Sequence, residues 1–178
     1  TYTGSSGQRY SYTYKDDTAT DLNGDSITGN MLMYIPTSEQ IAKMKFSGKT
    51  DAAKLEKAIQ SDKYLSTHRG QFSERNAGIS KFENHFDMQI AQDIFYDKAN
   101  KRKLQVTLDV INLSNLLNRN WGLYYSSSIY RNLLNIDKIT DDGNGNMIPT
   151  YSFYDDNAMY LNDFYSRWRC QLGVKLTF

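Results

Sequence analysis

Three oxygen-bearing side chains at alternate positions form the closest match in this chain to a metal-binding loop. Asp21, Asn23 and Asp25 have the spacing of the first three ligands in a calcium loop. The later requirements of such a loop are not met, because Ser26 stands where the sharp turn needs glycine and Leu32 stands where a bidentate glutamate completes the site. A solvated turn is therefore the better interpretation. Calcium is the weaker alternative, and we expect no other cofactor.

The two histidines, His68 and His85, lie in different predicted elements and do not form a pair. His85 shares one face of a predicted strand with Glu83 and Asp87, which formally suits acid–base hydrolysis. No motif places a nucleophile beside them, since Gly-x-Ser-x-Gly, a phosphate loop and His-Glu-x-x-His are all missing from the sequence. A row of hydrogen-bonded polar side chains is the simpler interpretation, and the sequence predicts no enzyme.

The segment that carries the clearest pattern is 167–178. Every second residue is apolar from Trp168 to Phe178, and the residues between them are polar or glycine. A period of two over twelve positions predicts a strand with one apolar face, and its length matches the roughly 9–11 residues that cross a bilayer at a tilt. Similar alternation upstream predicts further strands, so that the expected set lies near 8–14, 82–96, 103–113 continuing to about 127, and 165–178.

The lengths of the connections indicate which side of a membrane each one occupies. A short polar turn over 97–102 joins two predicted strands, whereas the connections 15–81 and 129–163 are long. Outer-membrane barrels have short periplasmic turns and long extracellular loops, so a periplasmic C-terminus would place both long connections outside the cell. The first loop contains a predicted helix over 51–65 with Thr50 as its cap, and the second contains a predicted hairpin. The expected fold is all-β: the C-terminal strands of an antiparallel transmembrane β-barrel.

Composition agrees with such strands and excludes other classes. Aromatic residues make up 13% of the chain and tyrosine alone supplies 14 residues, which suits interfacial girdles and tyrosine-rich loops. A net charge of +1 gives no reason to expect nucleic acid as a partner, and one cysteine excludes an internal disulfide. No apolar run reaches the roughly 20 residues of a membrane-spanning helix. Four strands cannot close a barrel, so we expect this chain to be one piece of a larger barrel whose N-terminal part is in another chain or absent.

The two faces of the predicted strands suggest different roles. We expect a lumen-facing set, which more often packs or is solvated than contacts substrate: Arg167, Arg169, Gln171, Lys175, Asp109 and Asp87. Apolar residues at every second position before Phe178 indicate the signal that barrel-insertion machinery reads: Phe178, Leu176, Val174 and Leu172. Cys170 falls on the lipid-facing side and counts there as a small apolar residue.

Several stretches resemble the TonB-dependent receptors of the outer membrane, and most closely the Bacteroidota type with a carboxypeptidase-regulatory-like N-terminal domain. The matching stretches are Asp21-Leu-Asn-Gly-Asp25, Tyr34-Ile-Pro36, Tyr64-Leu-Ser-Thr-His-Arg-Gly70, Glu74-Arg-Asn76, Asp109-Val-Ile-Asn112, Asn115-Leu-Leu-Asn118 with Trp121-Gly122, and 166–178. The resemblance implies a parent barrel of about 22 strands closed around a plug. It also implies energy coupling to TonB through an N-terminal part that this chain lacks.

The resemblance therefore predicts part of an outer-membrane transporter for a bulky nutrient such as a glycan, peptide or metal chelate. Its expected partners are the remaining N-terminal barrel and plug, TonB, outer-membrane lipid and a SusD-like surface lipoprotein. The long loops are expected to be extracellular and the C-terminus periplasmic. One alternative is a surface barrel that acts as an adhesin or structural protein, which an upstream plug and TonB box would exclude. Another is a secreted β domain, which conflicts with the one-sided loop lengths.

Overall fold

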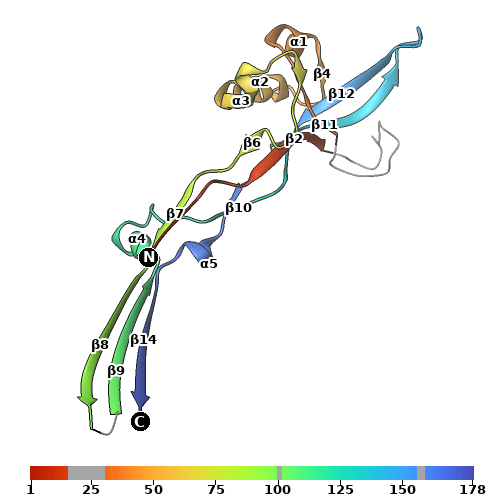
Figure 1. Cartoon of the computed structure of the whole chain (residues 1–178). Helices are drawn as coiled ribbons and strands as arrows, with labels where there is room; N and C mark the ends of the chain where they lie inside the picture. Colours follow the sequence, from red (N-terminus) through yellow and green to blue (C-terminus); the bar gives the residue numbers. More distant parts are fainter. Residues whose placement is uncertain (16–30, 100–101, 156–158) are drawn as a thin grey trace. The chain divides into compact units, whose positions relative to one another are not determined.

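A computed structural model describes residues 1–15, 31–99, 102–155 and 159–178 (Figure 1). The chain is mostly β, with 49% strand and 20% helix, and its strands form several small sheets. It divides into two compact units. Unit 1 contains 1–7, 81–126 and 160–178, and unit 2 contains 8–80 and 127–159. The predicted β class is confirmed, while none of the sheets among the described residues closes into a barrel.

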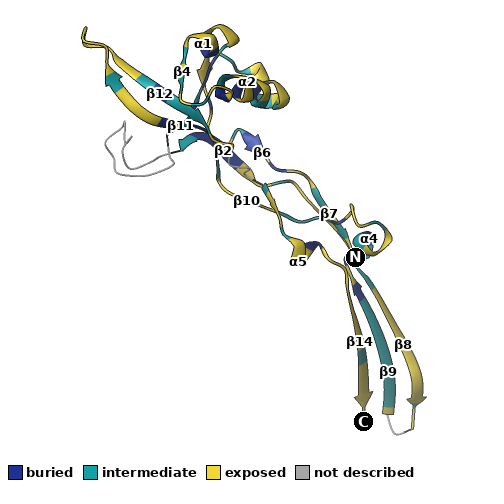
Figure 2. Ribbon diagram, turned by 180° about the vertical axis from the view of Figure 1, so that it is seen from behind, coloured by how far each residue is buried: buried dark blue, intermediate teal, exposed yellow. Residues whose placement is uncertain are grey.

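Unit 1 contains the predicted membrane strands as one antiparallel sheet. Its order is β14 (Arg169–Thr177), β9 (Arg102–Ile111) and β8 (Met88–Asp97). The strands have 9, 10 and 10 residues, close to the length that the alternation predicts. Figure 2 shows β8 and β14 mostly exposed on either side of the less exposed β9. No further strand pairs with the outer edges of β8 and β14 among the described residues.

The predicted strand over 82–96 is interrupted twice. Its first part, β7 (Glu83–Phe86), pairs with β1 (Tyr2–Ser5), and Asp87 separates it from β8. A register shift between Asp93 and Phe95 then places Phe95 opposite Leu104 and Tyr96 opposite Lys103. Even-numbered alternation from Ile90 would place Tyr96 in the same apolar row, but a β-bulge advances the pleat by one residue and puts Phe95 there instead.

The prediction that the next strand continues to about residue 127 is also wrong. β9 ends at Ile111, because Asn112 adopts the left-handed conformation with φ 56° and caps α4 (Leu113–Leu117). β10 (Tyr125–Ser127) pairs with β13 (Met159–Leu161) in a separate two-stranded sheet. The last strand also starts later than residue 165, because α5 (Asp163–Ser166) occupies that position.

Unit 2 contains a mixed five-stranded sheet, which corrects the all-antiparallel prediction. Its order is β4 (Lys45–Phe46), β12 (Met147–Phe153), β11 (Tyr130–Asp141), β2 (Arg9–Lys15) and β6 (Gly78–Ile79). β11 runs parallel to β2, and β4 runs parallel to β12. The strand predicted near 8–14 therefore exists, but it belongs to a different sheet from the other three predicted strands. The β11–β12 hairpin is confirmed.

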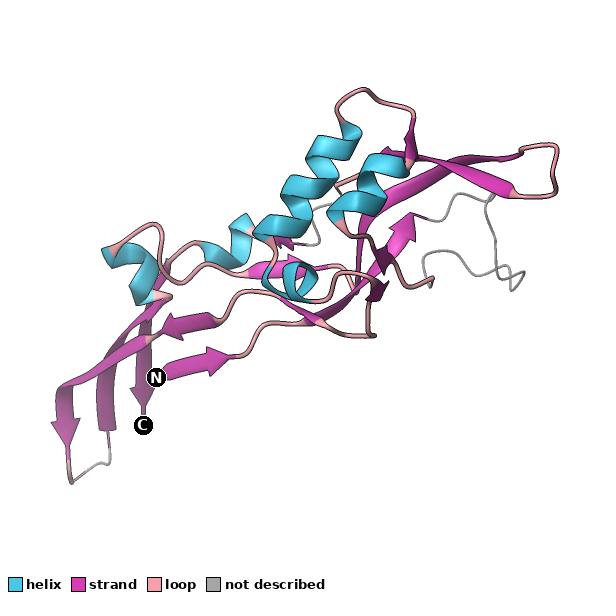
Figure 3. Ribbon diagram, turned by 90° about the horizontal axis from the view of Figure 1, so that it is seen from above, coloured by secondary structure: helices cyan, strands magenta, loops and turns pink. Residues whose placement is uncertain are grey.

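Three helices lie on the unit 2 sheet, with a short two-stranded antiparallel sheet of β3 (Tyr34–Ile35) and β5 (Gln71–Phe72) beside them (Figure 3). α1 (Ser38–Lys43) begins with a capping box. The helix predicted over 51–65 is instead two helices, α2 (Asp51–Ser61) and α3 (Lys63–Thr67). Thr50 makes no side-chain cap, and the single short helix that was expected is thus one of five described helices. The buried core of unit 2 consists of Tyr10, Tyr12, Met33, Ile35, Ile41, Leu55, Ile59, Leu65, Leu133 and Leu134.

None of the described helices is long and apolar enough to cross a membrane. The calcium prediction at Asp21, Asn23 and Asp25 falls on a segment that lies outside the described residues.

Candidate functional site

The unit 1 sheet separates polar from apolar side chains across all three strands. On the polar face, Gln171 lies opposite Asp109, which lies opposite Gln89. Lys175 lies opposite Gln105, whose amide donates a hydrogen bond of 2.9 Å to Asp93. A salt bridge of 2.9 Å also joins Lys103 to Asp93. Of the predicted lumen-facing residues, the structure brings Arg169, Gln171, Lys175 and Asp109 together on this face.

The opposite face of the sheet is apolar, and its side chains are exposed on β14 and partly buried on β9, where Val110 alone is buried. Its cross-strand rows include Leu172 opposite Leu108 opposite Ile90, and Leu176 opposite Leu104 opposite Phe95. Leu172 is 71% exposed and Val174 is 69% exposed. The members of this apolar face are Met88, Ile90, Phe95, Leu104, Val106, Leu108, Val110, Cys170, Leu172, Val174 and Leu176. One polar residue, Gln92, lies among them opposite Val106.

Two of the predicted lumen-facing residues lie elsewhere. Arg167 precedes the strand at the end of α5, where it pairs with Asp163. The carboxylate of Asp87 accepts a hydrogen bond of 2.8 Å from the backbone N–H of Asn112, so Asp87 holds the end of the sheet. Sequence alternation alone gives no sign of either contact, because both depend on neighbours outside the strand.

Asn112 is the centre of a buried junction at that end of the sheet. Its side chain is 2% exposed, and its amide donates hydrogen bonds to the carbonyls of Gly122 at 2.8 Å and Ser166 at 2.9 Å. Its side-chain oxygen accepts from the backbone N–H of Asn115 at 3.3 Å. A Cβ at Gly122 would lie 2.0 Å from that oxygen, so only glycine fits there. One asparagine thus joins three segments of unit 1.

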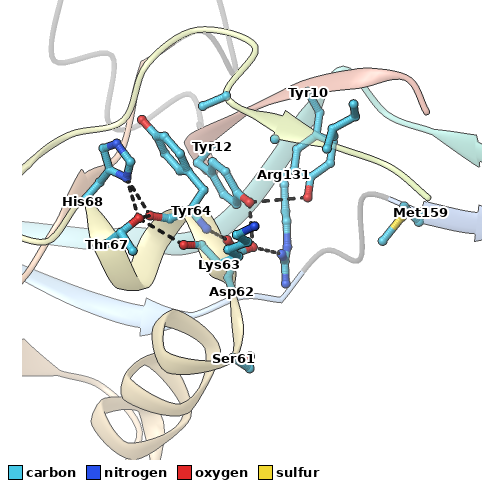
Figure 4. Close-up of a pocket in the computed structure, with 13 residues that line it drawn as sticks. Tyr10, Tyr12, Ser61, Asp62, Lys63, Tyr64, Thr67, His68, Arg131 and Met159 are labelled. Carbon is cyan, nitrogen blue, oxygen red and sulfur yellow. Dashed lines mark hydrogen bonds and ion pairs between the residues drawn. The ribbon is translucent and has the colours of Figure 1, made fainter. Parts of the chain in front are cut away.

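A cavity within unit 2 has a volume of about 510 Å³ (Figure 4). Its polar floor carries Tyr10 and Tyr12 from β2, Asp62 from the α2–α3 junction and Arg131 from β11. Its walls combine aromatic and apolar groups, among them Tyr64, His68, Ile79 and Met159. The volume lies within the range of about 300–1,000 Å³ that small-molecule sites occupy. We call this cavity the tyrosine pocket.

Asp62 has no hydrogen-bonding capacity left for a ligand. One carboxylate oxygen accepts from the backbone N–H groups of Tyr64 at 3.0 Å and Leu65 at 3.1 Å, which caps α3. The other accepts from the Tyr12 hydroxyl at 2.6 Å and from Arg131 at 2.9 Å. A carboxylate offers about four acceptor positions, and all of them are used. Asp62 therefore holds the residues of the pocket floor in place and is not available to accept hydrogen bonds from a ligand.

The bonds to Asp62 also decide which of the two tyrosine hydroxyls donates to the other. Because the Tyr12 hydroxyl donates to Asp62, its oxygen can only accept in its 3.4 Å contact with the Tyr10 hydroxyl. Tyr10 must then be the donor, which leaves its own oxygen available as an acceptor. Burial raises the pKa of Tyr12, and hydrogen bonds to Asp62 and Tyr10 raise it further. Tyr12 therefore stays a neutral phenol.

Arg131 supplies the positive charge of the pocket. Burial by itself would lower its pKa, but the nearby Tyr10, Tyr12, Asp155 and Asp62 raise it, so the guanidinium stays charged. Its ion pair with Asp155 is longer, at 3.6 Å, than its bond to Asp62, and its buried Nε has no hydrogen-bond partner. Arginine carries five N–H donors, so this group retains donors for a ligand acceptor.

A stack of rings forms the aromatic wall. The Tyr64 ring is parallel to that of Tyr12 at 5.7 Å and to that of His68 at 4.1 Å. The Nδ1 of His68 lies 2.9 Å from the Tyr64 carbonyl oxygen, which can only accept. Thr67 Oγ1 also lies 2.9 Å from Nδ1, so two contacts orient the imidazole ring. The tyrosine pocket thus offers both donors and acceptors, and Lys63 and Arg131 supply positive charge in its lining beside the saturated Asp62.

The sequence analysis did not predict this pocket. Its lining residues come from five segments of the chain, and no sequence pattern indicated that these segments meet. Among the described residues, no group of three or more His, Cys, Asp or Glu side chains is placed to hold a metal. His85 and Glu83 lie on β7, where the Glu83 carboxylate accepts from the backbone N–H of Tyr125 at 3.0 Å.

The fold and these sites define a mostly-β protein with an apolar sheet face and a separate small-molecule-sized pocket. Comparison with protein-family models, with curated proteins and with solved structures found no match.

Proposed function

We propose that this chain is part of an outer-membrane β-barrel and, more particularly, of a TonB-dependent receptor that takes up a bulky nutrient. The observation that carries the proposal is the apolar face of the unit 1 sheet. It runs across all three strands, and among the described residues its side chains are exposed or only partly buried, apart from the buried Val110. Among outer-membrane barrels, the sequence motifs described above favour the TonB-dependent receptors.

The physical argument rests on what an apolar sheet face requires. Leaving one leucine or valine side chain in water instead of burying it costs about 1.5–3 kcal/mol. The apolar face has 11 members in three strands, so water is a poor solvent for it. Strands of 9 and 10 residues match the roughly 9–11 that cross a bilayer, and the two open edges suit further barrel strands. In a barrel, lipid would cover the apolar face and neighbouring strands would pair with the two open edges.

The tyrosine pocket supports an uptake role for the loops of unit 2. It presents the Tyr10 oxygen as an acceptor and Arg131 as a donor, and the carboxylate of its floor, Asp62, is saturated. A neutral ligand with several hydroxyl or amide groups fits such a surface, because each of these groups both donates and accepts. We infer that the pocket contributes to binding of nutrient outside the cell.

Cysteine labelling in membranes tests the proposal. The single native cysteine, Cys170, lies on the apolar face, and Gln171 is the next residue on the polar face. We expect a bimane dye on Cys170 to be quenched by brominated lipid. Cys170 should also resist a water-soluble maleimide. The matched double variant Cys170→Ala with Gln171→Cys should escape lipid quenching and react with the water-soluble reagent through the lumen.

The hairpin turn provides the control for sidedness. Asn144, at the exposed tip between β11 and β12, should react with membrane-impermeant maleimide on intact cells when it is replaced in Asn144→Cys. Equal reactivity of positions 170 and 171 toward the water-soluble reagent, in membranes that contain the chain, would refute a lipid-facing sheet.

A further inference from the structure

A second, smaller cavity in unit 2 is lined almost entirely by aromatic and soft apolar groups. Its volume is about 210 Å³, and its lining residues are Tyr14, Tyr34, Pro36, Gln40, Met44 and Tyr151. They come from β2, β3, α1 and β12 and from the segments beside them. None of these described lining residues carries a charge. We call this cavity the tyrosine cage.

The chemistry of the lining excludes most kinds of ligand. A metal ion needs carboxylate, thiolate or imidazole ligands, and an anion needs a cation or a set of N–H donors, which the lining lacks. The volume falls below the roughly 300–1,000 Å³ that holds a whole drug-sized molecule, so the occupant is a single head group. Aromatic rings have negative faces that attract cations, and sites for quaternary ammonium groups are built from such rings.

The hydrogen bonds of the lining favour a methylated cation over a primary ammonium. The Tyr14 oxygen already accepts from the backbone N–H of Tyr34 at 3.3 Å. The Gln40 amide donates to the Tyr34 hydroxyl at 3.1 Å, and its oxygen accepts from the Thr37 backbone N–H at 2.8 Å. The lining offers a lysine-type ammonium only neutral hydroxyl and amide oxygens and no carboxylate, so its strong hydration would be replaced by weaker partners. A trimethylammonium group has no N–H and loses nothing in this way.

The rings are held in place from outside the cage. The Tyr34 ring packs edge-on against Phe72 at 5.2 Å, and the Tyr151 ring packs against Phe46 at 6.3 Å. Burial raises the pKa of Tyr14 to about 12 and also raises the pKa of Tyr151, so both phenols are neutral at physiological pH. Rings that are already ordered lose little entropy when a ligand enters.

We propose that the tyrosine cage binds a trimethylammonium group, as found in choline-type head groups. This inference does not rest on the membrane location or on the uptake function proposed above, and it concerns a site separate from the tyrosine pocket. A neighbouring contact shows the same chemistry within the chain, since the Lys15 ammonium lies 3.7 Å from the centre of the Tyr154 ring.

Titration calorimetry of the full chain with choline tests the proposal, with the uncharged analogue in which carbon replaces nitrogen as the comparison. We expect choline to bind about tenfold more tightly than the analogue, because the two share shape and differ in charge. Tyr151→Leu should weaken choline binding about tenfold, while Tyr151→Phe keeps the ring and should change it less than about twofold. Tetramethylammonium should compete with choline.

Two controls keep the result interpretable. Helical circular dichroism identifies any variant that fails to fold, and Tyr124→Leu, which changes a tyrosine of unit 1, should leave binding unchanged. Phosphocholine and a trimethyllysine peptide then distinguish a lipid head group from a protein source. Absence of choline binding, equal affinity for the uncharged analogue, or wild-type affinity in Tyr151→Leu would each overturn the proposal.

Discussion

The two units place their apolar residues in opposite ways. Every residue of the buried core cluster belongs to unit 2, where side chains from β2, β11 and the helices enclose one another. In unit 1, by contrast, the strand residues of β8 and β14 leave their apolar side chains exposed. The difference shows that unit 2 supplies its own interior, whereas the unit 1 sheet requires an apolar environment from outside. Sequence hydrophobicity alone does not distinguish these two needs.

The largest expected effect contrasts one leucine from each unit. Leu55→Ala in the unit 2 core should lower the free energy of unfolding by about 2–5 kcal/mol, because Leu55 is fully buried and the change leaves a cavity. The same change at the exposed Leu172 should cost less than about 1 kcal/mol in detergent, since no cavity forms.

Denaturant titration with two probes measures both effects. Helical circular dichroism reports mainly on unit 2, which contains α1, α2 and α3, whereas both tryptophans, Trp121 and Trp168, lie in unit 1. Leu55→Ala should shift the helical transition. Similar losses for Leu55→Ala and Leu172→Ala would contradict the comparison of the two units.

The second prediction concerns the bilayer itself. Leu172→Arg should reduce stability in lipid vesicles by about 2–4 kcal/mol if the residue lies near the midplane, because the charge then faces hydrocarbon. Gln171→Arg, one residue away on the polar face, should have a much smaller effect. Reversible unfolding in vesicles, followed by tryptophan fluorescence, gives both values, and equal costs would exclude lipid on one face only.

The third prediction tests the floor of the tyrosine pocket. Arg131→Leu should destabilise unit 2 by about 1–3 kcal/mol, since it removes a partner of the carboxylate of Asp62, whose side chain is only 12% exposed. Arg75, an exposed arginine of the same unit, provides the matched control in Arg75→Leu. Thermal unfolding monitored by helical circular dichroism should separate the two variants, and a control loss as large as that of Arg131→Leu would argue against the network.

The smallest effect depends on pH. The Arg69 guanidinium, bonded to both oxygens of Glu56, holds the pKa of Glu56 below its usual range. Because the folded pKa is the lower one, this contribution is present above the ordinary value of about 4.3 and is lost as the pH falls through the folded value. Glu56→Gln should therefore cost about 0.5–1 kcal/mol at neutral pH and nothing in strong acid. A cost that is equal at both pH values would contradict this assignment.

Local pattern predicted the strands well and their partners poorly. Alternation placed the starts of β14 and β9 to within a few residues, because side-chain direction in a strand depends only on sequence spacing, whereas it overestimated how far β9 continues. The pairing of β2 with β11 was missed. Their residues Ser11 and Tyr130 lie far apart in sequence, and no short-range signal specifies a parallel contact between them.

The interruptions in the pattern explain the remaining errors. The bulge beside Ile94 and the left-handed Asn112 are single-residue events that change direction without changing composition. Asp62 ends one helix and caps the next, and the continuous helical pattern over 51–65 did not indicate this break. The tyrosine pocket was hidden for a related reason, since its groups converge only after these turns are made.

The parallel pairing of β2 with β11 also constrains the order in which the protein forms after synthesis. Unit 2 requires residues 8–80 and 127–159, and the segment between them, 81–126, belongs to unit 1. The unit 1 sheet in turn waits for β14 at 169–177. Neither unit can be completed until residues beyond 126 have been made. Closing such long loops is slow, so the newly made chain passes through a lengthy unfolded period during which a chaperone can hold it.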